Sequence, residues 1–211
     1  MHEFPGGIYA LTAETADTAQ LLTQVEAALA GGVAAVQYRD KSGDVARRHE
    51  QASELIALCR RFDVPLIVND DLRLADLTDA DGVHLGRDDG SLREARIILG
   101  RDKFIGASCY QSLELALTAQ AAGADYVAFG SFFTSPTKPA APRAGLDLLR
   151  DATAVIQVPL VAIGGITLAN APQLLDAGAD SLAVLSTLFD APDIRTAAHD
   201  LNQLFATESE E

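Results

Sequence analysis

Short apolar runs alternate along the chain with longer stretches in which apolar residues recur every three or four positions. Within the runs, such as YVAF from Tyr126 and LVAI from Leu160, polar residues do not alternate with apolar ones. This pattern is typical of parallel strands that are buried on both faces. The expected strands are Ile8–Thr12, Ala34–Tyr38, Leu66–Asn69, Gly82–Leu85, Phe104–Ser108, Tyr126–Phe129, Leu160–Ile163 and Leu182–Leu185. The intervening segments have helical spacing.

Strands that alternate with helices in this way predict an α/β protein with a parallel sheet, here a single (β/α)8 TIM barrel. No linker or compositional shift divides the chain, so we expect one catalytic domain over residues 1–205 and an acidic, disordered tail over residues 206–211. A weak repeat of small and acidic residues precedes several strands. It predicts that Asp81, Asp125 and Asp180 are turn residues at the end of the barrel opposite to the chemistry.

Composition narrows the class of protein. The chain of 211 residues is 48% hydrophobic and 22% charged, which indicates a folded domain with a sizeable core. Its net charge of −14 makes nucleic acid an unfavourable partner. No apolar run is long enough to span a bilayer and no secretory signal is present, so we expect no membrane association. Cys59 and Cys109 form no disulfide framework, which favours a reduced, cytoplasmic protein.

Polar side chains gather where the expected strands end. The loop after Tyr38 carries QYRDK, from Gln37 to Lys41, and its alternation places Gln37, Arg39 and Lys41 on one side. An arginine fork and a lysine charge suit a diphosphate. The alternative is a solvated basic turn paired with Asp40. Ser108 ends a later strand at the same rim, where barrel enzymes hold their active sites.

Carboxylates follow two neighbouring strands. Asn69, Asp70 and Asp71 come after one strand, and Asp88 and Asp89 come after the next. Mg²⁺ typically takes one or two carboxylates and completes its shell with water and substrate phosphate. The alternative for the first group is a helix N-cap, and one aspartate can cap while the other binds metal.

Two further segments suit phosphate groups. The loop FTSPTKPAAPRAG presents Ser135, Thr137 and Lys138, whose hydroxyls and charge suit phosphate oxygens; the alternative is an idle surface loop. AIGGI and VLS, with Gly165 and Ser186, place backbone amides beside glycines, as in many phosphate-binding barrels. His84 lies within a strand and is expected to be a hydrogen-bonded core residue, facing either the barrel interior or the helices.

In this order and at this spacing, the motifs resemble those of the thiamine-phosphate synthase family over nearly the whole chain. The family pattern Q-x-R-x-K is met by Gln37, Arg39 and Lys41, and N-D by Asn69 and Asp70. G-x-H-x-G-Q-E-D appears as Gly82, His84, Gly86, Arg87, Asp88 and Asp89, with arginine in place of the glutamine. T-x-T-K appears as Ser135, Thr137 and Lys138, and AIGGI matches in full.

The resemblance implies an enzyme that joins a hydroxymethylpyrimidine diphosphate to a thiazole phosphate and releases pyrophosphate. Its partners would be these small molecules, and the sequence leaves a homodimer open. By the same resemblance, Mg²⁺ would be held by Asp70 and Asp89, and the catalytic residues would be Arg39, Lys41, Ser108 and Lys138. The implied substrate-binding residues are Gln37, Arg39, Lys41, Asn69, Ser108, Ser135, Thr137, Lys138, Gly165, Leu185 and Ser186.

Three other functions compete with this one. A thiazole tautomerase of the same superfamily would use a histidine after the fifth strand, where this chain has Ser108, Cys109 and Tyr110. A Schiff-base aldolase would need a lysine inside a strand, and none of the three lysines is so placed. A non-catalytic sensor of thiazole or thiamine phosphates would bind ligand without turnover.

Overall fold

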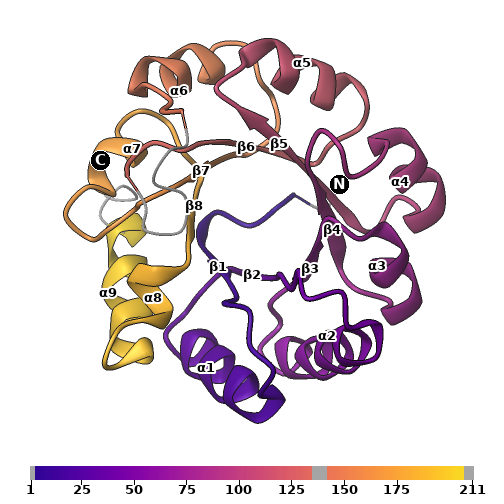
Figure 1. Cartoon of the computed structure of the whole chain (residues 1–211). Coiled ribbons are helices and arrows are strands. Elements are labelled where there is room, and N and C mark those ends of the chain that lie inside the picture. Colours follow the sequence, from indigo (N-terminus) through magenta and orange to yellow (C-terminus); the bar gives the residue numbers. More distant parts are fainter. Residues whose placement is uncertain (1–2, 135–141, 207–211) are drawn as a thin grey trace.

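The centre of the computed structural model, which describes residues 3–134 and 142–206, is a closed barrel of parallel strands. Each strand pairs with the next in sequence, and β8 returns to pair with β1 (Figure 1). The strands are β1 (Gly7–Leu11), β2 (Ala35–Tyr38), β3 (Leu66–Asn69), β4 (Gly82–Leu85), β5 (Phe104–Tyr110), β6 (Tyr126–Gly130), β7 (Leu160–Ile163) and β8 (Ser181–Val184).

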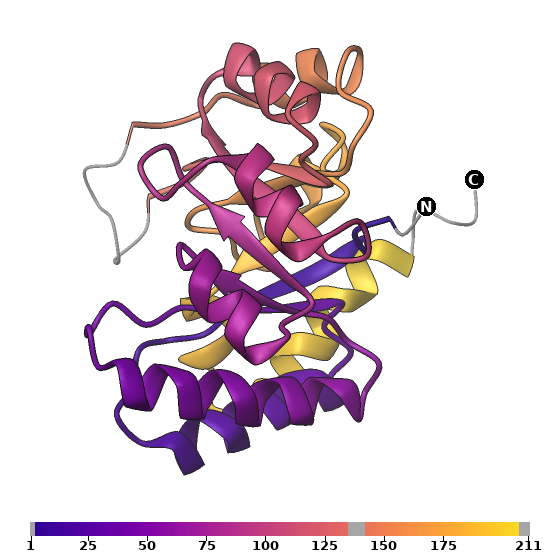
Figure 2. The ribbon, with the colours of Figure 1, turned by 90° about the vertical axis from the view of Figure 1, so that its right-hand side faces the viewer.

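Helices surround the barrel and cover the outer face of the sheet (Figures 1 and 2). They are α1 (Thr18–Ala30), α2 (Val45–Arg60), α3 (Leu72–Thr78), α4 (Leu92–Leu99), α5 (Leu113–Ala121), α6 (Leu146–Thr153), α7 (Pro172–Leu175), α8 (Ser186–Phe189) and α9 (Ile194–Ala206). The first five begin after an Asp or Ser whose side chain accepts a hydrogen bond from an amide of the first turn. Such caps satisfy amides that have no partner inside the helix.

The (β/α)8 barrel predicted from the sequence is confirmed. Every expected strand is present, with ends that differ by at most two residues. The largest difference is in β5, which continues to Tyr110 through a register irregularity after Ser108. Hydrophobic pattern does not show this irregularity, because it depends on pairing with β6. Ala206, assigned to the tail by the sequence, is the last residue of α9, and the rest of the predicted tail lies outside the described residues.

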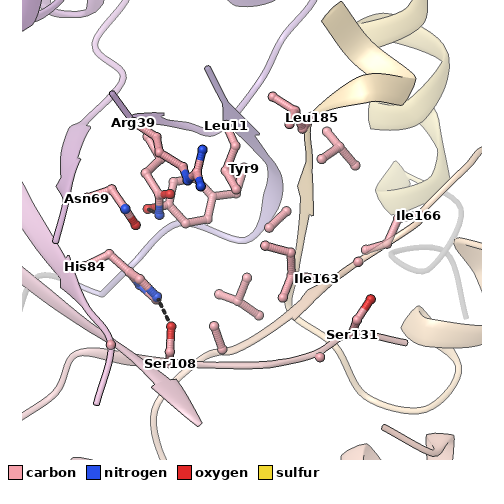
Figure 3. Close-up of a pocket in the computed structure, with 18 of the residues that line it drawn as sticks. Tyr9, Leu11, Arg39, Asn69, His84, Ser108, Ser131, Ile163, Ile166 and Leu185 are labelled. Carbon is pink, nitrogen blue, oxygen red and sulfur yellow. Dashed lines mark hydrogen bonds between the residues drawn. The ribbon is translucent and has the colours of Figure 1, made fainter. Parts of the chain in front are cut away.

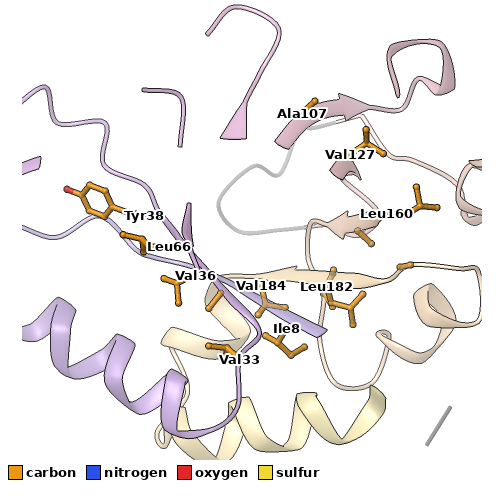
Figure 4. Close-up of a cluster of buried hydrophobic side chains, with 14 of the residues drawn as sticks. Ile8, Val33, Val36, Tyr38, Leu66, Ala107, Val127, Leu160, Leu182 and Val184 are labelled. Carbon is orange, nitrogen blue, oxygen red and sulfur yellow. The ribbon is translucent and has the colours of Figure 1, made fainter. Parts of the chain in front are cut away.

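Two apolar clusters stabilise the barrel. The larger lies between the strands and the helices and includes Val36, Leu66 and Leu182 (Figure 4). The smaller fills the barrel interior, where the ring of Phe4 stacks on Tyr126 with centroids 3.9 Å apart. Burial of each such side chain contributes about 1.5–3 kcal/mol. The described residues therefore pack the interior at the amino ends of the strands and leave it open at the carboxyl ends.

The aspartates of the sequence repeat are structural, as predicted. Each of Asp81, Asp125 and Asp180 accepts a hydrogen bond from a backbone amide at the start of the preceding strand, at 2.9, 2.6 and 2.7 Å. These amides belong to β3, β5 and β7. Each carboxylate thus links the segment before one strand to the start of the preceding strand, at the amino end of the barrel. There it gives a partner to a backbone amide that the sheet ladder leaves without one.

Replacing Asp125 should lower stability without changing catalysis. Asp125 accepts from the Ile105 amide and pairs with Arg96, so Asp125→Asn weakens both contacts. We expect the free energy of unfolding, measured by urea denaturation, to fall by about 1–3 kcal/mol. Asp102→Asn, an exposed aspartate at the same end, serves as the control. An equal loss in both variants would show that the interstrand contact is not the cause.

Candidate active site

One cavity of about 950 Å³ opens at the carboxyl ends of the strands. All eight strands contribute lining residues: Tyr9 and Leu11, Gln37, Asn69, His84, Ser108, Ala128 and Gly130, Val161 and Ile163, and Ala183 and Val184. Figure 3 shows Arg39, Asn69 and His84 on one wall, with Ile163, Ile166 and Leu185 on another. The cavity therefore has a polar wall and a largely apolar wall, as expected for organic substrates that carry charged groups.

The β2 end presents its side chains as the alternation predicted. Gln37, Arg39 and Lys41 line the cavity, whereas Tyr38 packs outward and donates to Gln51 at 2.9 Å. Asp40 pairs with Arg47 at 3.2 Å and so does not neutralise the cavity cations. Within the described part of the chain, the Arg39 guanidinium forms no ion pair, which leaves its donors available for an anion.

Two carboxylates meet on the polar wall. Asp70, at the end of β3, has a left-handed φ of 63°, and its carboxylate lies 3.3 Å from Lys41 Nζ. Asp89 accepts from the Gly86 amide at 3.0 Å. Burial and a hydrogen bond with Asp70 raise the pKa of the Asp89 carboxyl, although the Gly86 amide and Lys41 oppose the shift. Asp71 is the N-cap of α3, in agreement with one of the two interpretations that the sequence allowed.

This carboxylate pair is chemically suited to a divalent cation. Two carboxylates within hydrogen-bonding reach repel each other unless a proton or a cation lies between them, and this repulsion adds to burial in raising the pKa of Asp89. In the described residues, no third His, Cys, Asp or Glu joins the group. A hard cation that keeps several waters and substrate oxygens, such as Mg²⁺, suits two carboxylates better than Zn²⁺ does.

Ser108 and His84 form the centre of the polar wall. The Ser108 hydroxyl lies 2.9 Å from His84 Nε2, and His84 Nδ1 lies 3.0 Å from the Tyr126 hydroxyl. Both histidine nitrogens are hydrogen-bonded, so His84 is a satisfied core residue, as predicted, and it faces the barrel interior. Burial lowers the pKa of His84 to about 4, against the smaller, opposite effect of the Asp70 charge. The imidazole is therefore neutral at pH 7.

A glycine turn after β7 forms the opposite side of the cavity. Gly164 and Gly165 have φ of 106° and 65°, and a Cβ on Gly165 would collide with the backbone of Thr134. The carbonyls of Ile163, Gly164 and Gly165 all accept hydrogen bonds from neighbouring groups. Leu185 and Ser186, at the start of α8, line the cavity beside this turn. The carbonyls are thus satisfied within the protein, whereas the amides of the two segments are suited to an anion.

Most of the residues predicted from the sequence come together in this cavity. Gln37, Arg39, Lys41, Asn69, Asp70, Asp89, Ser108, Gly165, Leu185 and Ser186 all line it. Ser135, Thr137 and Lys138 lie outside the described residues. Cys109 is buried, and burial raises the pKa of its thiol to about 12, so its thiol is poorly suited to act as a nucleophile.

Sequence reasoning missed several residues of the site. Tyr9 and Tyr126 read as ordinary strand residues, yet their hydroxyls, 2.9 Å apart, lie buried beneath the cavity. Tyr110 was also missed; it meets Arg87, which the sequence had placed in the motif after the fourth strand, and the guanidinium carbon lies 5.3 Å from the ring centroid. The sequence did contain a signal for Tyr9 and Tyr126, because each is a tyrosine inside an otherwise apolar run and a buried hydroxyl needs a hydrogen-bond partner.

The fold and the cavity together define a class: a (β/α)8-barrel enzyme for phosphorylated small molecules, with cations and paired carboxylates facing a glycine turn. The family model described as thiamine monophosphate synthase matches residues 8–188. The chain belongs to this family.

Individual relatives agree. A thiamine-phosphate synthase of Thiobacillus denitrificans is 76% identical over 211 residues, covering 100% of both chains. One of Methylobacillus flagellatus is 53% identical over 94% of this chain and 95% of its own. The solved thiamine phosphate pyrophosphorylase of Pyrococcus furiosus is 35% identical, with a TM-score of 0.85 and coverage of 95% of this chain and 96% of its own. These relatives give no support to a tautomerase or a sensor.

No helix among the described residues is long and apolar enough to cross a membrane.

Proposed function

We propose that the cavity catalyses the thiamine-phosphate synthase reaction of thiamine biosynthesis, a transferase reaction. A hydroxymethylpyrimidine diphosphate would be joined to a thiazole phosphate, giving thiamine phosphate and pyrophosphate. The observation that carries the proposal is that a single cavity is lined by two separate groups whose chemistry suits anions. Arg39 and Lys41 stand at one wall, and the Gly164–Gly165 turn stands at the other. A coupling of two phosphorylated substrates needs both.

On the polar wall, Arg39 and Lys41 are proposed to bind the diphosphate. The Arg39 backbone is positioned by a hydrogen bond to the Thr12 hydroxyl at 3.1 Å, and the Lys41 amide donates to Glu14 at 2.9 Å. Both contacts tie the β2 end to the loop after β1, so the backbone that carries the two cations is held in place before substrate arrives. Ser108 and Lys138 would add further donors, and Gln37 and Asn69 would bind the pyrimidine.

Mg²⁺ is proposed to bind at Asp70 and Asp89. When bound, it would neutralise charge on the departing diphosphate. Lys41 would stay beside Asp70, where its ammonium can reach both the carboxylate and a phosphate oxygen. The two carboxylates would in this way be relieved of the repulsion that contributes to the raised pKa of Asp89.

On the other side, the thiazole phosphate is proposed to bind the amides of Gly165, Leu185 and Ser186, with Ser135 and Thr137 completing the site. Glycine at position 165 is required for two reasons: its φ is positive and a side chain would strike the Thr134 backbone. The apolar residues Ile163 and Ile166, which flank the glycine turn and line the cavity, would hold the thiazole ring against the pyrimidine.

The reaction is proposed to be dissociative. The bond between the pyrimidine methylene carbon and the diphosphate oxygen breaks first, because an electron-rich aminopyrimidine can stabilise the resulting cation. The thiazole nitrogen lone pair then forms the new carbon–nitrogen bond, and the diphosphate keeps the electron pair of the broken bond. The protein's part is to stabilise charge on the leaving group and to align the nucleophile. With both cysteines buried and free, we also propose a cytoplasmic location.

Pyrophosphate release by the purified chain tests the proposal. We expect release and thiamine phosphate formation in equal amounts when both substrates and Mg²⁺ are present. Omission of either substrate, or removal of Mg²⁺ by chelation, should abolish both products. Binding of both ligands without release at any Mg²⁺ concentration would contradict the synthase and leave a sensor. Isomerisation of the thiazole phosphate alone would indicate a tautomerase.

A further inference from the structure

A chain of hydrogen bonds crosses the barrel beneath the cavity. Gln37 Nε2 donates to the Tyr9 hydroxyl at 2.9 Å, and the hydroxyls of Tyr9 and Tyr126 are 2.9 Å apart. The Tyr126 hydroxyl lies 3.0 Å from His84 Nδ1. His84 Nε2 in turn lies 2.9 Å from the Ser108 hydroxyl, a contact drawn in Figure 3. The first four residues are buried, with at most 6% of each exposed. Ser108 is only partly buried, so it is the end of this hydrogen-bond network that is most open to a ligand.

The donor at one end decides the direction of every bond. The Gln37 amide nitrogen can only donate, so the Tyr9 oxygen accepts there and keeps its own hydrogen for Tyr126. Tyr126 accepts that hydrogen and has one of its own, which can go to His84 Nδ1. A neutral imidazole that accepts at Nδ1 carries its proton on Nε2 and donates it to Ser108.

Reversing the direction would leave a hydrogen without a partner. If Ser108 donated to His84, then His84 would donate to Tyr126, and Tyr126 to Tyr9. The Tyr9 oxygen would receive hydrogens from both Tyr126 and Gln37, and its own hydrogen would have no acceptor in the chain. A buried hydroxyl hydrogen without a partner costs about 1–3 kcal/mol. Burial also keeps the imidazole uncharged, so His84 cannot satisfy both neighbours as a double donor.

We infer that Gln37, Tyr9, Tyr126 and His84 act as positioning residues that hold the Ser108 hydroxyl as a hydrogen-bond donor toward the cavity. The Ser108 oxygen accepts from the imidazole, so its single hydrogen remains for a ligand. A hydroxyl that already accepts a hydrogen bond is a better donor, because successive bonds polarise one another. The identity of the acceptor, an oxygen of the departing diphosphate, rests on the function proposed above.

The inference assigns a role to buried groups that the proposed reaction does not otherwise use. In the reverse direction, Ser108 would present only lone pairs to a diphosphate oxygen, and the contact would be repulsive. The direction of the bonds therefore matters twice, for the hydrogen left without a partner in the folded protein and for the charge that develops on the leaving group. It also explains why Gln37 would serve two purposes, contact with the pyrimidine and a fixed donor at the start of the chain.

The protonation site of His84 in the unaltered protein is the first test. Nitrogen NMR of the chain labelled at histidine distinguishes the two neutral tautomers, with the His84 signals assigned by their loss in His84→Gln or by contact with the Tyr126 ring. We expect the proton on Nε2 at pH 7. A proton on Nδ1 would overturn the inference. This measurement needs no turnover, so its failure is distinct from failure of the synthase assignment.

Kinetic coupling is the second test. Single-turnover pyrophosphate release should fall about 10²-fold in Ser108→Ala, the magnitude typical for removal of one donor to a developing negative charge. In Tyr126→Phe the Ser108 hydroxyl remains but loses its orientation, so we expect a fall of about tenfold and tautomer exchange at His84. The double variant should be no slower than Ser108→Ala, because Tyr126 acts through Ser108. Independent, multiplying losses would contradict the inference.

Tyr38→Phe is the matched control, because Tyr38 is also buried and its hydroxyl also bonds to a side chain, that of Gln51, but outside the barrel. It should lose stability much as Tyr126→Phe does and keep the wild-type single-turnover rate. An equal rate loss in Tyr38→Phe would show that the effect of Tyr126 is one of general stability, and would overturn the inference.

Discussion

Asp89→Asn should lower kcat by about 10³-fold. It should also remove most of the dependence of the rate on Mg²⁺ concentration, because only one carboxylate, that of Asp70, would remain to bind the cation. The measurement is pyrophosphate release as a function of Mg²⁺ at saturating substrates. The same substitution should stabilise the protein in the absence of Mg²⁺. The amide that replaces the carboxylate can donate to Asp70, and it removes the partly desolvated charge and the repulsion that together raise the pKa of Asp89.

The sign of the pH effect follows from that raised pKa. The folded protein binds the Asp89 proton more tightly than the unfolded chain does. Stability without Mg²⁺ is therefore highest below the usual carboxyl pKa and is lost as pH rises through the raised, folded value. Mg²⁺ binds the deprotonated pair, so its stabilising effect should grow over the same interval. Thermal unfolding with and without Mg²⁺ across this pH range measures the loss of stability without the cation and the stabilisation by the cation.

The control is Asp76→Asn, which removes an exposed carboxylate on α3, away from the cavity. It should leave the Mg²⁺ dependence, the rate and the pH profile unchanged. Wild-type Mg²⁺ dependence in Asp89→Asn would contradict the assignment of the metal site, and loss of that dependence in both variants would show only a response to net charge.

Arg39→Gln should lower kcat/KM for the pyrimidine diphosphate by about 10²–10³-fold and change the KM of the thiazole phosphate little. Arg39 lines the cavity and makes no ion pair among the described residues, so its charge is available to the diphosphate. Gln keeps hydrogen-bonding capacity but loses the charge and the two-pronged geometry. Steady-state kinetics with each substrate varied in turn measures the difference.

Arg61→Gln is the matched control, because Arg61 is exposed and pairs with Glu26 on the outer helices. It should have wild-type kinetics with both substrates. If Arg39→Gln instead raised the KM of the thiazole phosphate alone, the two anion sites would have to be exchanged.

Much of this architecture could be predicted from local pattern. Apolar runs such as LVAI at β7 specify buried parallel strands, and the alternation in QYRDK specifies which side chains of the β2 end share a face. Both follow from backbone periodicity, which acts over a few residues. The structural role of Asp125 was predictable for the same reason, because the repeat that contains it marks a turn before a strand.

Other features depended on contacts between distant segments. Sequence offered both a cap and a metal site for Asp70 and Asp71. The structure shows Asp71 as the cap, and only the approach of Asp89 from the next strand shows that Asp70 has a carboxylate partner. It also left open which way His84 faces. The answer depends on barrel closure, which brings Tyr126 and Ser108 to its two ring nitrogens.

The sequence by itself thus determined the barrel, the rim that carries the polar residues and the family to which they point. The tertiary structure decided which carboxylates meet and in which direction the buried hydrogen bonds run. The physical reason is that period and turn chemistry are local properties. The pairing of charges and the sharing of hydrogens depend instead on register and closure between strands far apart in the chain.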